Sequence, residues 1–450
     1  MNSGIVKLNE IIIDHAEKSG AQQVEAFTID VKMINAYVEG GKMNVITNNE
    51  WIGIGIRTVI DKRVSFVSGI YNKEEDIENL IRTGIKLAKL SPKDEKFKSL
   101  PEPRQITGNI EDVYDEELEY LEPSTLWEYS NEIIMNAEKN GVRVMNGLIR
   151  VNIFKFNVMN SLGVDFSHKG TTVFIHFSAK KDVGEGVIKK YATSLKEIAW
   201  DAIGKELLDK TLISARARPY HGKSELEVII DPMELQGLLR GALQAANGEN
   251  INRKRSPWIG KLNQKIASED LTIIDDGRMR GGLRSALADD EGVPTTSKPI
   301  IEKGILKNYY YDHYNAGIAN TEPTGNGFRR GISSIENAHT TIPRCTLSNV
   351  KVLPSNKSLD DLVTEVDKGV IIKKFAYPEV DFITGNFGLE VRSAVLVENG
   401  SIGDSIKHAL LVGNIYEALN NISGIGRELF KVENFVLPYI RFRGIQLVGL

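Results

Sequence analysis

The order of predicted elements in the first half of the chain is the feature that most constrains its fold. Apolar residues at helical spacing and stretches of period-two alternation follow one another as helix, strands and helix at 5–16, 24–69 and 74–90. A second series repeats this order, with a helix after the predicted cap Ser124, strands at 142–159 and 170–179, and a helix at 194–208. This pattern indicates an α+β half built from helix–strands–helix units, and an internal duplication is one explanation of it.

The second half of the chain has a different pattern. Arg216–Pro219 forms a predicted linker, and after a strand and a helix the chain consists mainly of short strand patterns. A chain of 450 residues is too long for one typical core. We therefore predict the α+β class, with an N-terminal α/β two-layer domain at 1–218 and a strand-rich, antiparallel sheet-like or sandwich-like domain at 219–450.

Composition excludes several kinds of protein. The net charge is −4, which gives no basic excess for binding a nucleic-acid backbone. No apolar run approaches the roughly 18 residues that a membrane helix needs, and the N-terminus reads as an amphipathic helix instead of a signal peptide. The single cysteine, Cys345, allows no internal disulfide and no cysteine-based zinc site. We expect a cytoplasmic protein that binds neither nucleic acid nor membrane.

No local motif supplies metal ligands or a nucleophile. None of the seven histidines has another histidine three to five residues away, and HExxH is absent. Cys345 has no base nearby in the sequence, so we predict an inert thiol. Two acidic clusters, Asp275–Asp276 and Asp289–Glu291, have the oxygen ligands that a divalent cation prefers, but capping of helices and turns is the interpretation we favour.

The segment Leu287–Arg329 is more specialised than a core segment needs to be. Its three carboxylates are followed by a turn, a short strand pair around Gly304, the aromatic run Tyr309–Tyr311 and a Gly/Asn loop from Asn320 to Gly327. We predict that the aromatic run is a strand and that the segment is exposed, since loops of this composition often carry function.

Several motifs resemble one known family. DDEGVPT (289–295), EKGILKNYYYD (302–312) and PTGNG (323–327) are similar to motifs of the TldD/PmbA family, whose members were once called modulators of DNA gyrase. The resemblance continues at GAQQVEAF (20–27) and at FGLEVRSAVLVENGSIG (387–403), so it covers nearly the whole chain in the right order.

The resemblance implies a function in peptide hydrolysis. The family comprises TldD-type zinc metallopeptidases, which carry HExxxH on a helix and a cysteine near the C-terminus, and PmbA/TldE-type subunits, which lack the motif and pair with them to degrade unfolded or leader peptides. Here Arg240, Gly241 and Ala245 stand at the three HExxxH positions, and residues 426–438 contain no cysteine. The chain therefore resembles the PmbA/TldE type, and whether it is itself an enzyme stays open. We expect no metal or other cofactor in this chain and zinc in a TldD-type partner, with a self-dimer as the alternative assembly.

The same resemblance directs attention to residues that could line a peptide cavity. A Gly-rich loop flanked by strands can present a sheet edge to an extended peptide. The candidates for peptide binding are Asp289, Asp290, Glu291, Gly292, Thr295, Tyr309, Tyr310, Tyr311, Gly325 and Asn326.

Two alternatives remain open at this point. One is an independent metallohydrolase with a rearranged site, built from Asp275, Asp276, Asp289 and a distant histidine. The other is a regulator that binds DNA gyrase or a toxin–antitoxin component through protein contacts, which the older family name suggests.

Overall fold

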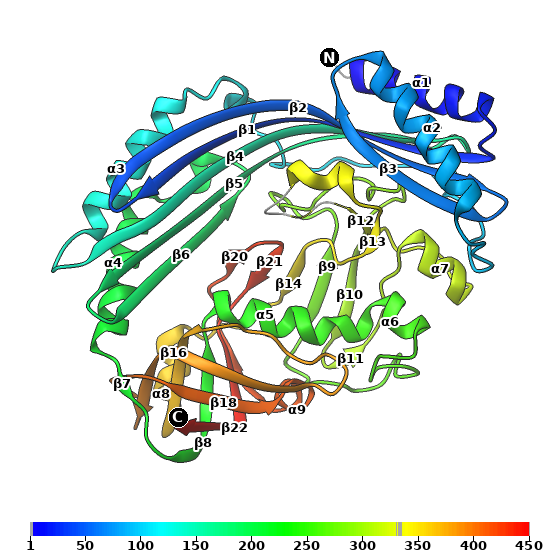
Figure 1. Ribbon diagram of the computed structural model, residues 1–450. Coiled ribbons are helices and arrows are strands. Elements are labelled where there is room, and N and C mark those ends of the chain that lie inside the picture. The colour runs from blue at the N-terminus through cyan, green and yellow to red at the C-terminus, as the bar shows by residue number, and fades with distance from the viewer. Residues whose placement is uncertain (1–2, 330, 332–334, 450) are drawn as a thin grey trace.

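An arched sheet covers a strand-rich lower part in the computed structural model of the chain (Figure 1). The structure describes residues 3–329, 331 and 335–449, without the side chain of Ser3. Among these residues no helix is long and apolar enough to cross a membrane.

The arched sheet is a six-stranded antiparallel sheet in the order β3-β2-β1-β4-β5-β6. Its strands are β1 (Gln23–Glu39), β2 (Lys42–Ile60), β3 (Arg63–Tyr71), β4 (Arg143–Asn160), β5 (Asp165–Lys181) and β6 (Gly184–Ala192). The accompanying helices are α1 (Ser3–Lys18), α2 (Glu74–Leu90), α3 (Pro123–Ala137) and α4 (Trp200–Arg216). The chain forms two units in this part, and each consists of a helix, three strands and a second helix. The two units meet at the centre of the sheet, where β1 pairs with β4. This arrangement is the one that an internal duplication produces.

Strand alternation gives the sheet two different faces. On β1, Val24 and Ala26 lie in a cluster with α1 and α2, and Ile34 and Ala36 lie in a cluster with α3 and α4. These residues are an even number of positions apart, so all four helices cover the same face. In Figure 1 this is the outer, convex face of the arch.

The inner face differs between the two halves of the sheet. In the first half, Phe27 and Phe156 are fully buried and pack with Ala286 and Ala288 from the second half of the chain. In the second half of the sheet, inner-face residues such as Phe174, His176 and Lys189 are only partly buried. The inner face of the first half is therefore covered by the rest of the molecule, and the inner face of the second half is partly accessible.

Most of the second half of the chain forms two further sheets. Strands β8 (Lys223–Ile230), β22 (Ile440–Gly449), β18 (Ala409–Asn414), β16 (Asn386–Glu398) and β15 (Lys368–Phe375) pair in a closed ring, since β15 contacts both β16 and β8. The ring is joined by β17 (Ser401–Lys407), β7 (Arg218–Pro219) and β19 (Ile422–Ile425). The other sheet has β11 (Ile305–Leu306), β10 (Ser297–Glu302), β9 (Ile273–Asp276), β14 (Val350–Val352), β21 (Phe435–Leu437) and β20 (Phe430–Val432), in that order.

The remaining elements are short. They are β12 (Gly327–Phe328), β13 (Arg344–Cys345), α5 (Pro232–Leu243), α6 (Gly248–Asn252), α7 (His313–Ala319), α8 (Leu359–Thr364), α9 (Ile415–Asn420) and the 3-10 turns Glu116–Tyr120, Leu195–Glu197, Gln244–Ala246 and Ile335–Thr340. The α+β class and the strand-rich second half are confirmed. The pairs β8–β15, β14–β21 and β7–β17 are parallel, so the predicted antiparallel character holds for most pairs only.

Three local predictions were wrong. The predicted helix at 194–208 begins at Trp200, because Ser194 caps only a single 3-10 turn and the chain is extended at Ile198. Helix α3 starts one residue before its predicted cap, with Glu122 as the N-cap and Pro123 in the first turn. Tyr309–Tyr311 is not a strand: its one pairing is an isolated bridge between Tyr310 and Asn247.

Candidate functional site: helix α5 and the pocket at its start

Helix α5 is placed by the strand before it and by its own apolar face. Strand β8 ends at Ile230, and the Asp231 carboxylate then accepts a hydrogen bond from the Met233 amide at 3.0 Å. This N-cap and the proline at the first helical position fix the start of the helix. Leu235 and Leu239 are fully buried in the core. The helix therefore presents a defined side toward the β20–β21 hairpin.

Arg240 lies on that side of the helix and is held by the hairpin. Its guanidinium forms an ion pair with Glu433, the turn residue between β20 and β21, and lies 5.8 Å from the centre of the Phe435 ring. The amide of Gln236 donates a second hydrogen bond to Glu433 at 3.4 Å. About half of the Arg240 side chain remains exposed. Helix and hairpin are thus joined by a cation and a carboxylate.

The other two positions of the motif face packed protein. A Cβ atom at Gly241 would lie 3.1 Å from the Cβ atom of Val380, and Ala245 is fully buried. An arginine is always charged and repels Zn²⁺, and neither glycine nor alanine has a side-chain lone pair to donate. Within the described part of the chain no group of three or more His, Cys, Asp or Glu side chains is arranged to hold a metal ion. The residues at these three positions do not fit a zinc ion.

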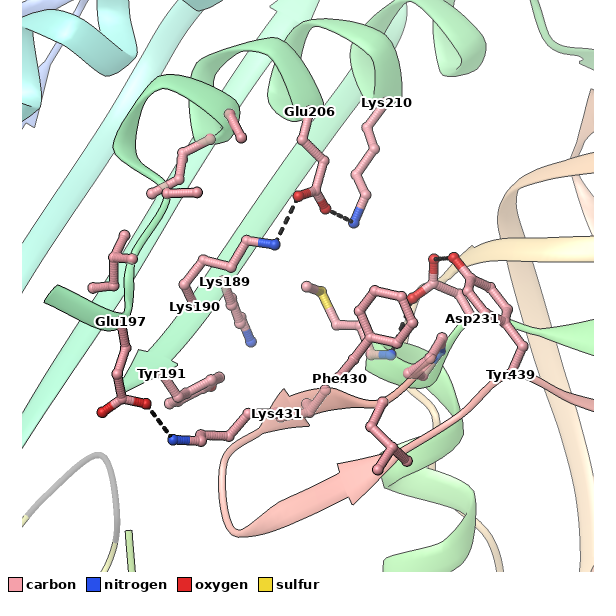
Figure 2. Close-up of a pocket in the computed structure, with 18 residues that line it drawn as sticks. Lys189, Lys190, Tyr191, Glu197, Glu206, Lys210, Asp231, Phe430, Lys431 and Tyr439 are labelled. Atoms are coloured by element: carbon pink, nitrogen blue, oxygen red, sulfur yellow. Dashed lines mark hydrogen bonds and ion pairs between the residues drawn. The ribbon is translucent and has the colours of Figure 1, made fainter. Parts of the chain in front are cut away.

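A pocket of about 300 Å³ lies beside the start of α5 (Figure 2). It is lined by β6, α4, α5 and the β20–β21 hairpin, with Tyr439 on its far side. Figure 2 shows two groups of ion pairs along it. The Glu206 carboxylate contacts the ammonium groups of Lys190 at 2.7 Å and Lys210 at 3.1 Å, and Lys431 contacts Glu197 at 2.7 Å.

These ion pairs decide the charge states in the pocket. Burial raises the pKa of the Glu206 carboxyl, but the charges of Lys210 and Lys190 outweigh it and the pKa is lowered. Burial lowers the pKa of the Lys210 ammonium, while Asp231 and Glu206 raise it more strongly. Burial also raises the pKa of the Tyr191 hydroxyl, and the Glu433 carboxylate adds to the effect. Glu206 and Lys210 are therefore charged and the Tyr191 phenol is neutral near pH 7.

The acidic cluster of Leu287–Arg329 lies inside the molecule, so the prediction of an exposed segment was wrong for this part of it, although Asn320 to Glu322 are exposed. Asp289 and Asp290 are fully buried, and Glu291 is 2% exposed. Asp289 accepts hydrogen bonds from the backbone amides of Glu291 and Val293, each at 3.0 Å, and from Gly327 at 2.7 Å. Burial and the charge of Glu291 raise the pKa of the Asp289 carboxyl. The acids hold turns, as the favoured interpretation predicted.

A buried ionic network joins this cluster to the arched sheet. Glu25 on β1 forms ion pairs with Arg57 on β2 and with Arg329, and Arg57 also contacts Glu291 at 3.2 Å. All four side chains are at most 9% exposed. Charges at this depth are stable only when they are paired. We name Glu25, Arg57, Glu291 and Arg329 the buried clamp.

The tyrosines among the candidates are also largely internal. Tyr310 is fully buried and Tyr311 is 8% exposed, whereas Tyr309 is partly buried and its hydroxyl donates to the Trp258 carbonyl. The structure thus places the aromatic run against the core, and its contact with a peptide stays a prediction.

The other candidates lie in the same interior region. Asn326 and Thr295 are fully buried and Gly292 is buried as well. Gly325 has a positive φ of 70°, and a Cβ atom there would lie 2.4 Å from the Pro294 carbonyl oxygen, so only glycine fits. None of the ten candidates lines the pocket at the start of α5.

The oxygens of Asp275 are occupied by protein donors. One accepts from the amide of Ser348 at 2.7 Å and from its hydroxyl, and the other from Lys298 at 2.9 Å and Asn326 at 2.8 Å. A neighbouring ammonium group and saturated oxygens disfavour a cation at this position. Cys345 is buried, and burial raises the pKa of its thiol, as expected for an inert cysteine.

Sequence reasoning missed Glu433 and the buried clamp. The Arg240–Glu433 pair joins residues 193 positions apart, and Arg57 and Glu291 are 234 positions apart. No local spacing or periodicity reports such pairs, so the sequence held no signal for them.

The pH dependence of stability should contain a contribution from Asp312. Burial, and then the charge of Glu291, raise the pKa of this carboxyl to about 7. The native state therefore keeps a proton that the unfolded state has lost above its usual pKa, so this contribution is present at low pH and disappears as pH rises through about 7. Between about pH 5 and pH 7 the free energy of unfolding should fall by at most about 1.4 kcal/mol per pH unit from this group.

Urea unfolding of the wild type and of Asp312→Asn at several pH values measures this contribution. Asp312 caps α7 by accepting from the Asn315 amide at 2.7 Å, and asparagine preserves that cap. The variant should show a flatter profile between about pH 5 and pH 8. Parallel profiles would contradict the prediction.

Comparison with known proteins gives the class and the family. A family model described as the PmbA/TldA metallopeptidase C-terminal domain matches residues 223–449, and the model of metallopeptidase domain 1 matches residues 24–88. With the arched sheet and the α5 site, these matches define a metallopeptidase-related protein. The chain belongs to the PmbA/TldD family, as the sequence motifs predicted.

Individual relatives agree with this assignment. The crystal structure of TldE from Thermococcus kodakarensis is 27% identical, with a TM-score of 0.89 over 98% of this chain and 99% of that one. A metalloprotease PmbA homolog of Buchnera aphidicola subsp. Acyrthosiphon pisum is 25% identical over 93% of this chain and 94% of its own length. A metalloprotease TldD homolog of Buchnera aphidicola subsp. Schizaphis graminum is 37% identical, but the match spans 40% of this chain and 36% of that protein.

A further structure agrees in fold alone. A Thermotoga maritima protein named as a candidate modulator of a DNA gyrase has a TM-score of 0.86 at 20% identity, over 98% of this chain and 99% of that chain.

Proposed function

We propose that this chain is the non-catalytic, PmbA/TldE-type subunit of a cytoplasmic zinc metallopeptidase complex that degrades or processes unfolded or leader peptides. In this proposal a TldD-type subunit binds the zinc ion and performs the hydrolysis. The present chain forms part of the wall of the peptide cavity. The observation that carries the proposal is the Arg240–Glu433 ion pair at the first position of the degenerate motif.

The chemistry of zinc hydrolysis supports this assignment. A catalytic zinc ion needs about three protein ligands and a bound water whose pKa it lowers. Arg240 brings a permanent positive charge to the position of the first ligand, and its carboxylate partner is already used by the guanidinium. Gly241 provides no general base. The proposal therefore assigns the metal and the base to the partner.

The inner face of the second half of the arch supports a role in holding peptide. Phe174, His176 and Lys189 offer an aromatic ring, an imidazole and a cation on one half-accessible surface of β5 and β6. Such a surface contacts an extended chain through both apolar and polar groups. Nine of the ten candidates, from Asp289 to Asn326, are buried in the region that the Arg57–Glu291 ion pair joins to the first half of the sheet, and we propose that the ten fix the shape of the wall.

Co-expression with the TldD-type protein of the same genome tests the proposal. The two chains should co-purify, and the complex should cleave an unfolded peptide in a chelator-sensitive manner. This chain alone should show no chelator-sensitive cleavage and no stoichiometric Zn²⁺ by metal analysis. A complex in which the HExxxH glutamate of the partner is replaced by glutamine is the control, because only the catalytic base is removed.

Three outcomes would overturn the proposal. Chelator-sensitive cleavage by this chain alone would favour the independent metallohydrolase. Stoichiometric metal in the isolated chain would do the same. Co-purification with DNA gyrase or a toxin–antitoxin component, in the absence of a TldD-type partner, would favour the regulator.

A further inference from the structure

We propose that a basic cleft between the end of the arched sheet and the strand ring binds the carboxylate side chains of an acidic peptide segment. The proposal rests on the proposed function and names the substrate class for it. The cleft is defined by Lys210, Lys373, Lys374, Arg392, Lys407 and His408, and it has a volume of about 580 Å³. This volume lies within the usual range for ligand sites.

The positive groups come from separate elements that converge on the cleft. Lys210 lies on α4, Lys373 and Lys374 on β15, Arg392 on β16, and Lys407 at the end of β17. Glu185 is the one carboxylate that lines the cleft among the described residues, and its side chain is 62% exposed and paired with Lys180 at 3.1 Å. The cleft therefore concentrates positive charge in a chain whose net charge is −4.

Part of this charge has no internal counterion. Lys210, Lys374 and Arg392 each contact a carboxylate, namely Glu206 at 3.1 Å, Glu234 at 3.4 Å and Glu390 at 3.2 Å. Within the described ranges, no carboxylate oxygen lies within 4.0 Å of the ammonium nitrogen of Lys373 or Lys407. Two lysines that face a concave surface without an acid partner are suited to an acid supplied by a ligand.

Of the two lysines, Lys373 is the one whose burial makes an acidic partner more important. Its side chain is partly buried, and burial lowers the pKa of its ammonium group. Asp231 opposes this shift and Lys210 adds to it. The ammonium also lies 5.5 Å from the centre of the Tyr439 ring, a contact that favours a cation. A ligand carboxylate at this point would supply a counter-charge and offset the hydration that burial has removed.

The strand beside the cleft explains why the ligand is a peptide. β6 is the last strand of the arched sheet, and within the described structure β5 is the only strand that pairs with it, although β20 also contacts it. Residues of β6 line both this cleft and the pocket of Figure 2, and Lys210 lines both as well. An extended peptide that adds to the edge of β6 would place alternate side chains toward the basic groups.

Fluorescence anisotropy with the full-length chain tests the assignment. The probe is a labelled, glutamate-rich peptide of eight residues, and the matched probe carries glutamine at the same positions. The glutamate peptide should bind about tenfold more tightly or better, and added salt should weaken it. Lys373→Met combined with Lys407→Met should remove the preference, whereas Lys18→Met on the outer helix α1 should leave it unchanged, since Lys18 is far from the cleft and 73% exposed.

A variant with a single charge reversal and a second probe, inorganic phosphate, complete the experiment. Lys407→Glu keeps a surface polar group and reverses one charge, so its effect on binding can be read if the double variant fails to fold. Equal binding of the two peptides, or binding of inorganic phosphate without the glutamate peptide, would overturn the assignment. If the complex with a TldD-type partner still cleaves neutral peptides in that case, the subunit function stands and only the acidic substrate class is lost.

Discussion

Replacing Glu25 by alanine should lower the free energy of unfolding by about 3–5 kcal/mol, because it leaves two buried cations without their shared counterion. Glu25 is 1% exposed and pairs with both Arg57 and Arg329. Burial raises the pKa of the Glu25 carboxyl, but the two arginines outweigh this effect and lower it, so the group is ionised in the native state. Urea unfolding followed by circular dichroism at neutral pH measures the loss.

The exposed pair of Lys62 and Glu95 is the matched control. Their separation is 3.2 Å, but the two side chains are 48% and 74% exposed. Glu95→Ala should change the free energy of unfolding by less than about 1 kcal/mol, since water screens an exposed pair. If Glu25→Ala had an equally small effect, the buried clamp would not be what holds the arched sheet to Leu287–Arg329.

Replacing Tyr310 by alanine should cost about 3–5 kcal/mol of stability, the range for deleting a large buried aromatic side chain. The Tyr310 side chain is surrounded by protein and is 0% exposed to solvent. Its hydroxyl donates a hydrogen bond to the Leu243 carbonyl at 3.3 Å. The Cys345 thiol donates to the Tyr310 carbonyl at 3.0 Å. The substitution opens a cavity in the core beside α5 and leaves a buried carbonyl unpaired.

Tyr309→Phe removes a single hydroxyl from the neighbouring tyrosine and is the mild comparison for the loss of the whole Tyr310 side chain. Tyr309 is partly buried, and its hydroxyl donates to the Trp258 carbonyl. Removing that hydrogen bond should cost about 0.5–1.5 kcal/mol. Thermal unfolding of both variants gives the comparison. A Tyr310→Ala protein of normal stability that no longer bound peptide would show that this side chain meets the ligand, contrary to its burial.

The periodicity of apolar residues was sufficient to predict the order of helices and strands that form the arched sheet and its covering helices. Alternation along β1 and β2 and the helical spacing of α1 and α2 are local properties, and the same properties recur from α3 to α4. Because they recur in the same order, an internal duplication stays one explanation of the two units. The motifs of the second half identified the family, although its closed ring of strands follows from pairings between distant segments and could not be predicted from periodicity.

The candidate site was less predictable because its partners are far apart in sequence. Acidic residues are usually exposed, so three consecutive carboxylates indicated a surface loop. In the folded chain Arg57 contacts Glu291 from 234 positions away, and Arg329 lies 38 positions beyond Glu291, so no local spacing links either arginine to the acidic cluster. For the same reason the degenerate motif at Arg240 was recognisable from its residues, whereas its partner Glu433 was not.

The unequal surroundings of the two helix–strands–helix units have a consequence for their tolerance of substitutions. In the first unit, an inner-face substitution at Phe27 or Phe156 meets packed atoms, so selection for folding restricts it. In the second unit, substitutions at Phe174, His176 or Lys189 meet a half-accessible surface and cost little stability. Inner-face substitutions should therefore be tolerated more readily in the second unit than in the first.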